Sequence, residues 1–235
     1  DNNGNGVRDA GDIGLADWKI LVTGTIDDSA MTDENGSFVI QNLPLGTYSV
    51  SEVAQDGWIL TLPASPGTYD FSVVSEERNN LDFGNFKLAS INGLSFHDNN
   101  GDGIQDVGDD LLENWAIDLS GPMNISTTTD ANGTYSFSDL TAGTYTVSEQ
   151  VQNNWGVSLP VTRTFSITIT SGLNATGKNF GNYIYSTLSG ISFEDMNGNG
   201  TYDIGEQGLS GKKIKVNGTK SDSAITDGTG NYSID

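Results

Sequence analysis

The chain of 235 residues carries 31 Asp and Glu residues against 10 Lys and Arg, a formal net charge of −21, and it contains no cysteine. So large a negative charge repels nucleic acid phosphates and anionic membrane surfaces, so neither is expected as a partner, and cations are the natural complement. The lack of cysteine excludes disulfides, thiolate nucleophiles and zinc–thiolate sites. No apolar run of about 18 residues is present, so this segment is not expected to insert directly into a membrane.

The sequence repeats with a period of 97 residues. The hexapeptide at 1–6 returns at 98–103 and at 195–200, and both differences, 98 − 1 and 195 − 98, equal 97. Trp18 matches Trp115 and Trp58 matches Trp155, which predicts a register without a gap. Such a period is too long for one coil of a solenoid and suits one small domain per repeat. We therefore expect a string of domains.

Short segments with two-residue alternation predict half-buried strands. They lie at residues 18–23, 37–40, 47–52, 69–73 and 165–169. Turn clusters separate such segments at intervals of about 8 to 12 residues, the spacing typical of an antiparallel β-sandwich. The sequence thus predicts an all-β chain with scarce helix and about seven strands in each copy.

A strand is expected before the second and third hexapeptides, at residues 89–96 and 189–193, and we name these segments opening strands. The expected domains are 1–87, a first copy without its opening strand, 88–185, a complete copy, and 186–235, the N-terminal half of a third copy. A half-domain of about 50 residues buries little core. We expect the ends either to be cut from a longer array or to be completed by a neighbouring chain that donates a strand.

Each copy carries a twelve-residue segment, here named an Asp loop, at 1–12, 98–109 and 195–206. Its positions 1, 3, 5, 7, 9 and 12 follow the ligand spacing of a calcium loop, with a backbone carbonyl at position 7 and a turn-forming glycine at position 6. Turn chemistry alone would explain the Asn-Gly runs but not the carboxylates at positions 9 and 12 in every copy. We expect at least one Ca²⁺ per loop, held by Asp1, Asn3, Asn5, Val7, Asp9, Asp12, Asp98, Asn100, Asp102, Ile104, Asp106, Asp109, Asp195, Asn197, Asn199, Thr201, Asp203 and Glu206.

The Asp loop begins after Ser-Phe-x and is followed by Thr-Asp-x-(Asn/Thr)-Gly-x-(Tyr/Phe) and, in the first two copies, by Gly-Thr-Tyr-x-Val-Ser-Glu. This pattern resembles the SdrD B-like repeats of microbial surface adhesins, relatives of the Cna B-type, prealbumin-like domains. The resemblance implies tandem seven-stranded Greek-key β-sandwiches, strung as calcium-dependent stalks outside the cell or on its surface. It also implies neighbouring repeats as partners, and identical chains where a fibre is built.

Other residues admit competing interpretations. Glu52 and Glu149 match the glutamate that promotes a Lys–Asn isopeptide bond in many Cna B-type relatives, but the second copy lacks the required lysine, so we expect them to accept backbone hydrogen bonds instead. The four tryptophans are expected in the core or at domain junctions rather than in a sugar site. Asp33, Asp130 and Asp227 are expected in hairpin turns rather than as further calcium ligands.

The leading functional hypothesis is a structural stalk or filament module made rigid by Ca²⁺. We place the Asp loops near the start of each domain, close to the preceding domain, where an ion would lock the joint. The alternatives are an adhesin domain that binds a glycan or protein, and a fibre subunit joined by strand exchange between chains. We do not expect an enzyme, because no carboxylate pair outside the loops recurs or converges as a glycosidase would require.

Overall fold

The computed structural model describes residues 1–74, 80–218 and 221–234. Every regular element in these ranges is a β-strand, which confirms the predicted all-β class. These residues form no helix that is long and apolar enough to cross a membrane. The chain divides into two compact units, Asp1–Gln152 with Val157–Tyr183, and Asn153–Gly156 with Ile184–Asp235. The predicted domain boundaries at 87/88 and 185/186 stay predictions.

The first copy contains two separate sheets. A four-stranded sheet has the order β2-β1-β3-β5, and a second sheet pairs β4 with β6. The strands are β1 (Lys19–Gly24), β2 (Asp28–Met31), β3 (Gly46–Glu52), β4 (Trp58–Leu62), β5 (Thr68–Val73) and β6 (Gly84–Lys87). The strand expected at 37–40 is not formed.

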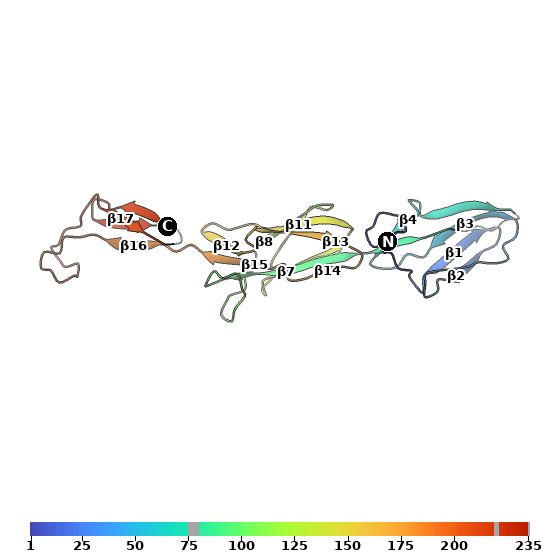
Figure 1. The fold of residues 1–235 in the computed structure, drawn as a ribbon, viewed down its shortest axis with the longest axis horizontal. Coiled ribbons are helices and arrows are strands. Elements are labelled where there is room, and N and C mark those ends of the chain that lie inside the picture. Colours follow the sequence, from blue (N-terminus) through green and yellow to red (C-terminus); the bar gives the residue numbers. More distant parts are fainter. Residues whose placement is uncertain (75–79, 219–220, 235) are drawn as a thin grey trace. The chain divides into compact units, whose positions relative to one another are not determined.

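The central copy is a sandwich of two sheets (Figure 1). One sheet has the order β10-β7-β15-β12, with β14 also paired to β7, and the other has the order β13-β11-β8-β9. The strands are β7 (Ala89–His97), β8 (Ala116–Ser120), β9 (Ile125–Thr128), β10 (Thr134–Leu140), β11 (Gly143–Glu149), β12 (Trp155–Leu159), β13 (Thr164–Ile169), β14 (Asn174–Ala175) and β15 (Phe180–Ile184). The central copy thus has more strands than the seven expected. One of the additional strands is the two-residue β14, which pairs with β7.

The third copy repeats the first strands of the central one. Its opening strand β16 (Leu188–Ile191) pairs with β19 (Asn231–Ile234), and β17 (Lys213–Val216) pairs with β18 (Asp222–Ile225). These pairs correspond to β7 with β10 and β8 with β9 in the central copy. The sequence repeat is thus a repeat of strand pairing.

Alternation along the strands places the core between the two sheets of the central copy. Ile117, Leu119, Tyr145 and Val147 come from one sheet and are at most 2% exposed. They pack in one cluster with residues of the other sheet, which include Ala89, Ile91, Tyr135, Phe137 and Phe180. Burial of such apolar side chains is the main stabilising contribution to a sandwich of this size.

The opening and closing strands of the central copy run parallel. Phe180, Gly181 and Asn182 on β15 pair with Ser95, Phe96 and His97 on β7. The antiparallel sandwich expected from the spacing is therefore mixed at this point. Because β7 and β15 end side by side, the chain enters the domain at Ala89 and leaves it at the opposite end.

The register between the first two copies is not free of gaps. Tyr48 on β3 pairs with Phe71, whereas its repeat mate Tyr145 on β11 pairs with Ile167, so β5 and β13 are related by 167 − 71 = 96 residues. The turn after β4, at 63–67, is one residue longer than the turn after β12, at 160–163. The ungapped register predicted from the sequence is wrong over this strand.

Candidate functional site

The first two Asp loops lie at the end of the domain where the chain leaves it. The amide of Asp98 donates to the carbonyl of Asn182 on β15 at 2.7 Å, and the nitrogen of Asp1 donates to the carbonyl of Asn85 on β6 at 3.0 Å. Nine residues of β7 at about 3.3 Å each carry the chain across the whole sandwich before the loop begins. The expectation that the loops face the preceding domain is therefore wrong.

The first Asp loop instead contacts the copy that follows it. The amide of Ser171 donates to the carbonyl of Asn2 at 2.9 Å. A Cβ atom placed on Gly4 would lie 2.7 Å from the Cβ of Ala142 and 3.3 Å from the ring of Phe86, which is fully buried here. The loop backbone thus packs against the next sandwich with no room for a side chain at Gly4.

The carboxylate at position 1 organises each loop from within. Asp98 accepts the N–H groups of Gly101, Asp102 and Gly103 at 2.7, 3.2 and 2.7 Å. Burial opposes its charge, but the hydroxyl of Ser158, followed by these three backbone donors, holds the pKa of Asp98 below its ordinary value. Asp195 receives the same three bonds from its own loop, and they lower its pKa as well. Backbone bonds of the loop therefore fix the orientation of the carboxylate at position 1.

Side chains at positions 3, 5 and 9 converge. In the first loop the amide groups of Asn3 and Asn5 both donate to Oδ2 of Asp9, each at 2.8 Å. In the third loop Asn197 and Asn199 donate to Oδ2 of Asp203 at 2.8 and 2.7 Å. In the second, Asn100 donates to Asp102 and Asp106 at 3.0 and 3.3 Å. Each carboxylate at position 9 therefore accepts hydrogen bonds from asparagine side-chain amide groups.

The carboxylate at position 12 closes the loop. Asp109 accepts the N–H of Asn99 at 3.1 Å and that of Asp106 at 3.0 Å. Glu206 accepts the N–H of Met196 and that of Asp203, both at 3.0 Å. Asp12 accepts the N–H of Asn2 at 2.8 Å, which lowers its pKa. Position 12 thus ties the start of every loop to its end.

The donor set fits a calcium ion. Positions 1, 3, 5, 9 and 12 present carboxylate and amide groups, and a carboxylate that accepts N–H bonds keeps further lone pairs. Rotating an amide group by half a turn exchanges its nitrogen for its oxygen, which would aim oxygens at the point where the amides now meet the carboxylate. No group of three or more Asp, Glu, His or Cys side chains in the described part of the chain is placed to hold a metal. An ion in a loop would therefore also need amide and backbone oxygens as ligands.

The second family of aspartates forms turns. Oδ1 of Asp130 accepts the N–H groups of Asn132 and Thr134 at 2.8 and 2.9 Å. These bonds, first among them the one from Thr134, lower the pKa of Asp130. Asp33 and Asp227 make the same pair of bonds in their own copies. The hairpin-turn interpretation is confirmed.

Glu149 bridges the two sheets of the central copy. It accepts hydrogen bonds from the hydroxyl of Ser95 at 2.6 Å and from the amide of Asn182 at 2.7 Å. The expected partners were backbone groups, and that prediction is wrong. Burial raises the pKa of Glu149 to about 7, against the lowering effect of its two donors. In the central copy the hydroxyl of Ser95 therefore lies beside the Glu149–Asn182 pair.

The tryptophans fall into two groups. Trp18 and Trp115 are 4% and 3% exposed, which confirms core packing. Trp58 and Trp155 are half-buried in both copies, and the ring of Trp58 meets that of Trp18 edge-on at 5.3 Å. The surface aromatic cluster that would distinguish one copy as an adhesin is not formed by these four residues.

Fold and loops together define a class, namely tandem β-sandwich repeats that each carry an acidic loop beside the closing strand. Residues 89–176 match the family model of the SdrD B-like domain. The match lies within the central copy, and the outer copies repeat the motifs of that copy at the 97-residue period.

Two staphylococcal proteins align with almost the whole chain. The chain is 28% identical over 273 residues to serine-aspartate repeat-containing protein D of Staphylococcus aureus (strain Newman), covering 99% of the chain and 20% of that protein. It is 29% identical over 283 residues to serine-aspartate repeat-containing protein F of Staphylococcus epidermidis (strain ATCC 12228 / FDA PCI 1200), covering 99% and 16%. The chain spans about a fifth or less of these relatives.

Among solved structures, the Bacillus anthracis TIE protein aligns over 96% of this chain and 41% of its own, with 19% identity and a TM-score of 0.38. GBS52, the minor pilin of Streptococcus agalactiae, aligns over 78% of this chain and 89% of its own, with 13% identity and a TM-score of 0.34.

Proposed function

We propose that the chain is a stalk or filament segment of an extracellular, cell-surface protein, and that Ca²⁺ bound in the Asp loops stabilises and stiffens it. The observation that supports a role as a stalk is the parallel pairing of β7 with β15. A domain whose first and last strands end together must receive the chain at one end and release it at the other. Copies joined in this way extend an array instead of folding back.

Calcium is supported by the convergence of loop side chains. Asp98, Asp106 and Asp109 accept bonds from the amides of Asp102, Asn100 and Asp106 within one twelve-residue loop. Equivalent bonds occur in the first and third loops. Like charges gathered in a small loop repel one another, and a divalent cation removes that repulsion. Binding to the folded state alone then stabilises the domain.

The ion would also act on the joint between copies. The first loop contacts Ser171 and Ala142 of the central copy through its own backbone at Asn2 and Gly4. A loop fixed by a cation presents this backbone in one conformation. Three equivalent copies are a poor way to build one active site, and no catalysis is part of the proposal.

The test is unfolding and sedimentation of the chain with Ca²⁺, with Mg²⁺ and with a chelator. We expect Ca²⁺ to raise the free energy of unfolding by about 3 kcal/mol at a hundredfold excess over its Kd, and to slow proteolysis, while equal Mg²⁺ does less. Equal protease resistance and equal sedimentation after chelation would contradict the calcium role. The stalk role would fail if the chain sedimented as a compact sphere in every buffer.

A further inference from the structure

The first Asp loop carries a positive charge that the other two loops lack. Position 8 is Arg8 in the first loop, Gln105 in the second and Tyr202 in the third. The first loop has a net charge of −2, because three carboxylates accompany one guanidinium, whereas four carboxylates give the second loop −4. The N–H at position 6 donates to the carboxylate at position 1 over 2.7 Å in each loop. The first two loops thus share this backbone bond and differ in side-chain charge.

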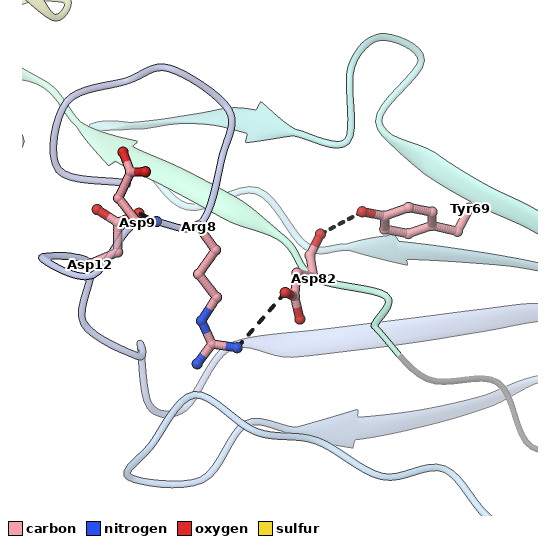
Figure 2. A network of polar contacts seen from close by, with 5 residues as sticks. All are labelled: Arg8, Asp9, Asp12, Tyr69 and Asp82. Atoms are coloured by element: carbon pink, nitrogen blue, oxygen red, sulfur yellow. Dashed lines mark hydrogen bonds and ion pairs between the residues drawn. The ribbon is translucent and has the colours of Figure 1, made fainter.

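The guanidinium of Arg8 interacts with carboxylates outside and inside the loop. It reaches Oδ2 of Asp82, in the segment before β6, over 3.8 Å (Figure 2). Within the loop, the N–H of Asn2 has the largest effect in lowering the pKa of Asp12, and the charge of Arg8 adds to it. Asp12 also accepts the N–H of Asp9 at 2.9 Å. Arg8 therefore acts on a carboxylate that belongs to the proposed calcium loop.

The ion pair between Arg8 and Asp82 is open to solvent. The two side chains are 69% and 45% exposed. A pair of this kind contributes little to stability, so its loss would not unfold the domain. Its weakness also lets the guanidinium exchange between Asp82 and the carboxylates of the loop.

The same two positions differ together in the central copy. Gln105 stands in the place of Arg8, and Asn179 stands in the place of Asp82. The side chain of Asn179 accepts the N–H of Leu94 on β7 at 3.2 Å. A charged pair in the first copy is thus a neutral pair of residues in the second, which links the two positions.

We propose that Arg8 lowers the affinity of the first Asp loop for Ca²⁺ below that of the second, so that the joint to the central copy stiffens only at the higher calcium concentration. This inference rests on the proposed function, because it concerns the regulation of the same loops. A divalent cation that enters the first loop meets a unit positive charge, and like charges repel. The second loop lacks that charge and has an additional carboxylate, Asp102, and calcium affinity depends on the charge of the ligands.

The contacts of the first loop explain why its affinity matters for the joint. Its backbone packs against the central copy, where the carbonyl of Asn2 accepts the N–H of Ser171 at 2.9 Å. The second loop is tied to its own copy, because the N–H of Asp98 donates to the carbonyl of Asn182 at 2.7 Å. Rising Ca²⁺ would therefore stabilise the central copy first and the joint second.

The test is a calcium titration of the whole chain, followed by NMR at backbone amides that hold the same place in each loop. These are the amides of Gly6, Gly103 and Gly200. We expect the midpoint at Gly6 to lie at a calcium concentration about tenfold above that at Gly103. Hydrogen exchange of the Ser171 amide should slow with the midpoint of Gly6 and not with that of Gly103.

Three variants isolate the charge. Arg8→Gln copies the residue of the second loop and should lower the Gly6 midpoint about threefold, the effect of one partly screened charge. An unchanged Gly103 midpoint in this variant shows that the chain is folded. Arg8→Lys keeps the charge and should behave as the wild type does. Gln105→Arg places the charge in the second loop and should raise the Gly103 midpoint by about the same factor.

Several results would overturn the inference and leave the calcium role intact. They are an unchanged Gly6 midpoint in Arg8→Gln, equal Gly6 midpoints in Arg8→Lys and Arg8→Gln, and equal midpoints at Gly6 and Gly103 in the wild type. Slowing of the Ser171 amide at the Gly103 midpoint would overturn the part that concerns the joint. If no loop amide responded to Ca²⁺, the proposed calcium role would fail together with this inference, so the two failures are distinguishable.

Discussion

The hydroxyl of Ser95 on β7 donates to Oε1 of Glu149 on β11 over 2.6 Å, and this bond joins the two sheets of the central copy through its core. Ser95 is fully buried, so water cannot replace the hydroxyl. We expect Ser95→Ala to lower the free energy of unfolding by about 1 to 3 kcal/mol, measured by urea titration.

Ser126 supplies the matched control, because its hydroxyl also donates to a carboxylate, that of Asp118, but on an exposed surface. Ser126→Ala should change the stability by less than about 0.5 kcal/mol. If both substitutions had equal effects, burial would not be the reason for the importance of Ser95.

The raised pKa of Glu149 predicts that stability falls with rising pH. Burial moves its pKa from 4.5 to about 7 in the folded state, so the native protein holds a proton that the unfolded chain releases. The resulting stabilisation is complete below about pH 4.5 and is lost as pH rises through 7, by up to about 3 kcal/mol. The pKa of Glu52 is raised as well, with burial as the main cause.

Urea titrations at pH 5 and pH 8 measure this effect. The variant Glu149→Gln should lose the part of the difference that Glu149 contributes, and the part due to Glu52 should remain. The loop aspartates with lowered pKa, Asp195 and Asp203 among them, act in the opposite sense and at lower pH, where falling pH removes stability. A wild-type protein equally stable at both pH values would show that Glu149 titrates normally.

Gly4 and Gly101 occupy the same loop position but differ in their surroundings. Both have positive φ, +69° and +73°, so alanine costs about 1 to 2 kcal/mol of backbone strain at either. Only at Gly4 would the new methyl group collide, with Ala142 of the next copy. Gly4→Ala should therefore accelerate hydrogen exchange of the Ser171 amide, which donates to Asn2.

Gly101→Ala should leave that exchange rate unchanged. If the Ser171 amide exchanged at the same rate in wild type and in Gly4→Ala, the first loop would not contact the central copy in solution.

Asp102 gives the second loop one carboxylate more than the first and third, which carry Asn5 and Asn199 at that position. We expect Asp102→Asn to weaken calcium binding by the second loop severalfold, because one ligand loses its charge. Calorimetric titration of the chain measures the change. Asp130→Asn, in a turn that binds its own backbone, is the control that should leave calcium affinity unaltered.

Local pattern was sufficient for several strands and for one family of turns. Alternation placed β1, β3, β5 and β13 within a residue or two of their bounds, and the turn at Asp130 followed from its Asx chemistry. The segment at 37–40 has the same alternation but forms no strand, because pairing requires a neighbour that pattern cannot supply.

Long-range pairing could not be read from the sequence. Ser95 meets Glu149 across 54 residues and Asn182 across 87, and no local signal links the three. The parallel pairing of β7 with β15 and the loop position beside Asn182 depend on how the strands cross the sandwich. The one-residue shift between β5 and β13 was hidden because a later change of length restores the period.

The parallel arrangement of β7 and β15 also fixes how a pulling force acts on the central copy. Tension that enters at Ala89 and leaves at Ile184 draws the two neighbouring strands past each other lengthwise. Their hydrogen bonds are then loaded in shear and must break together, whereas a hairpin pulled from its open end unzips one bond at a time.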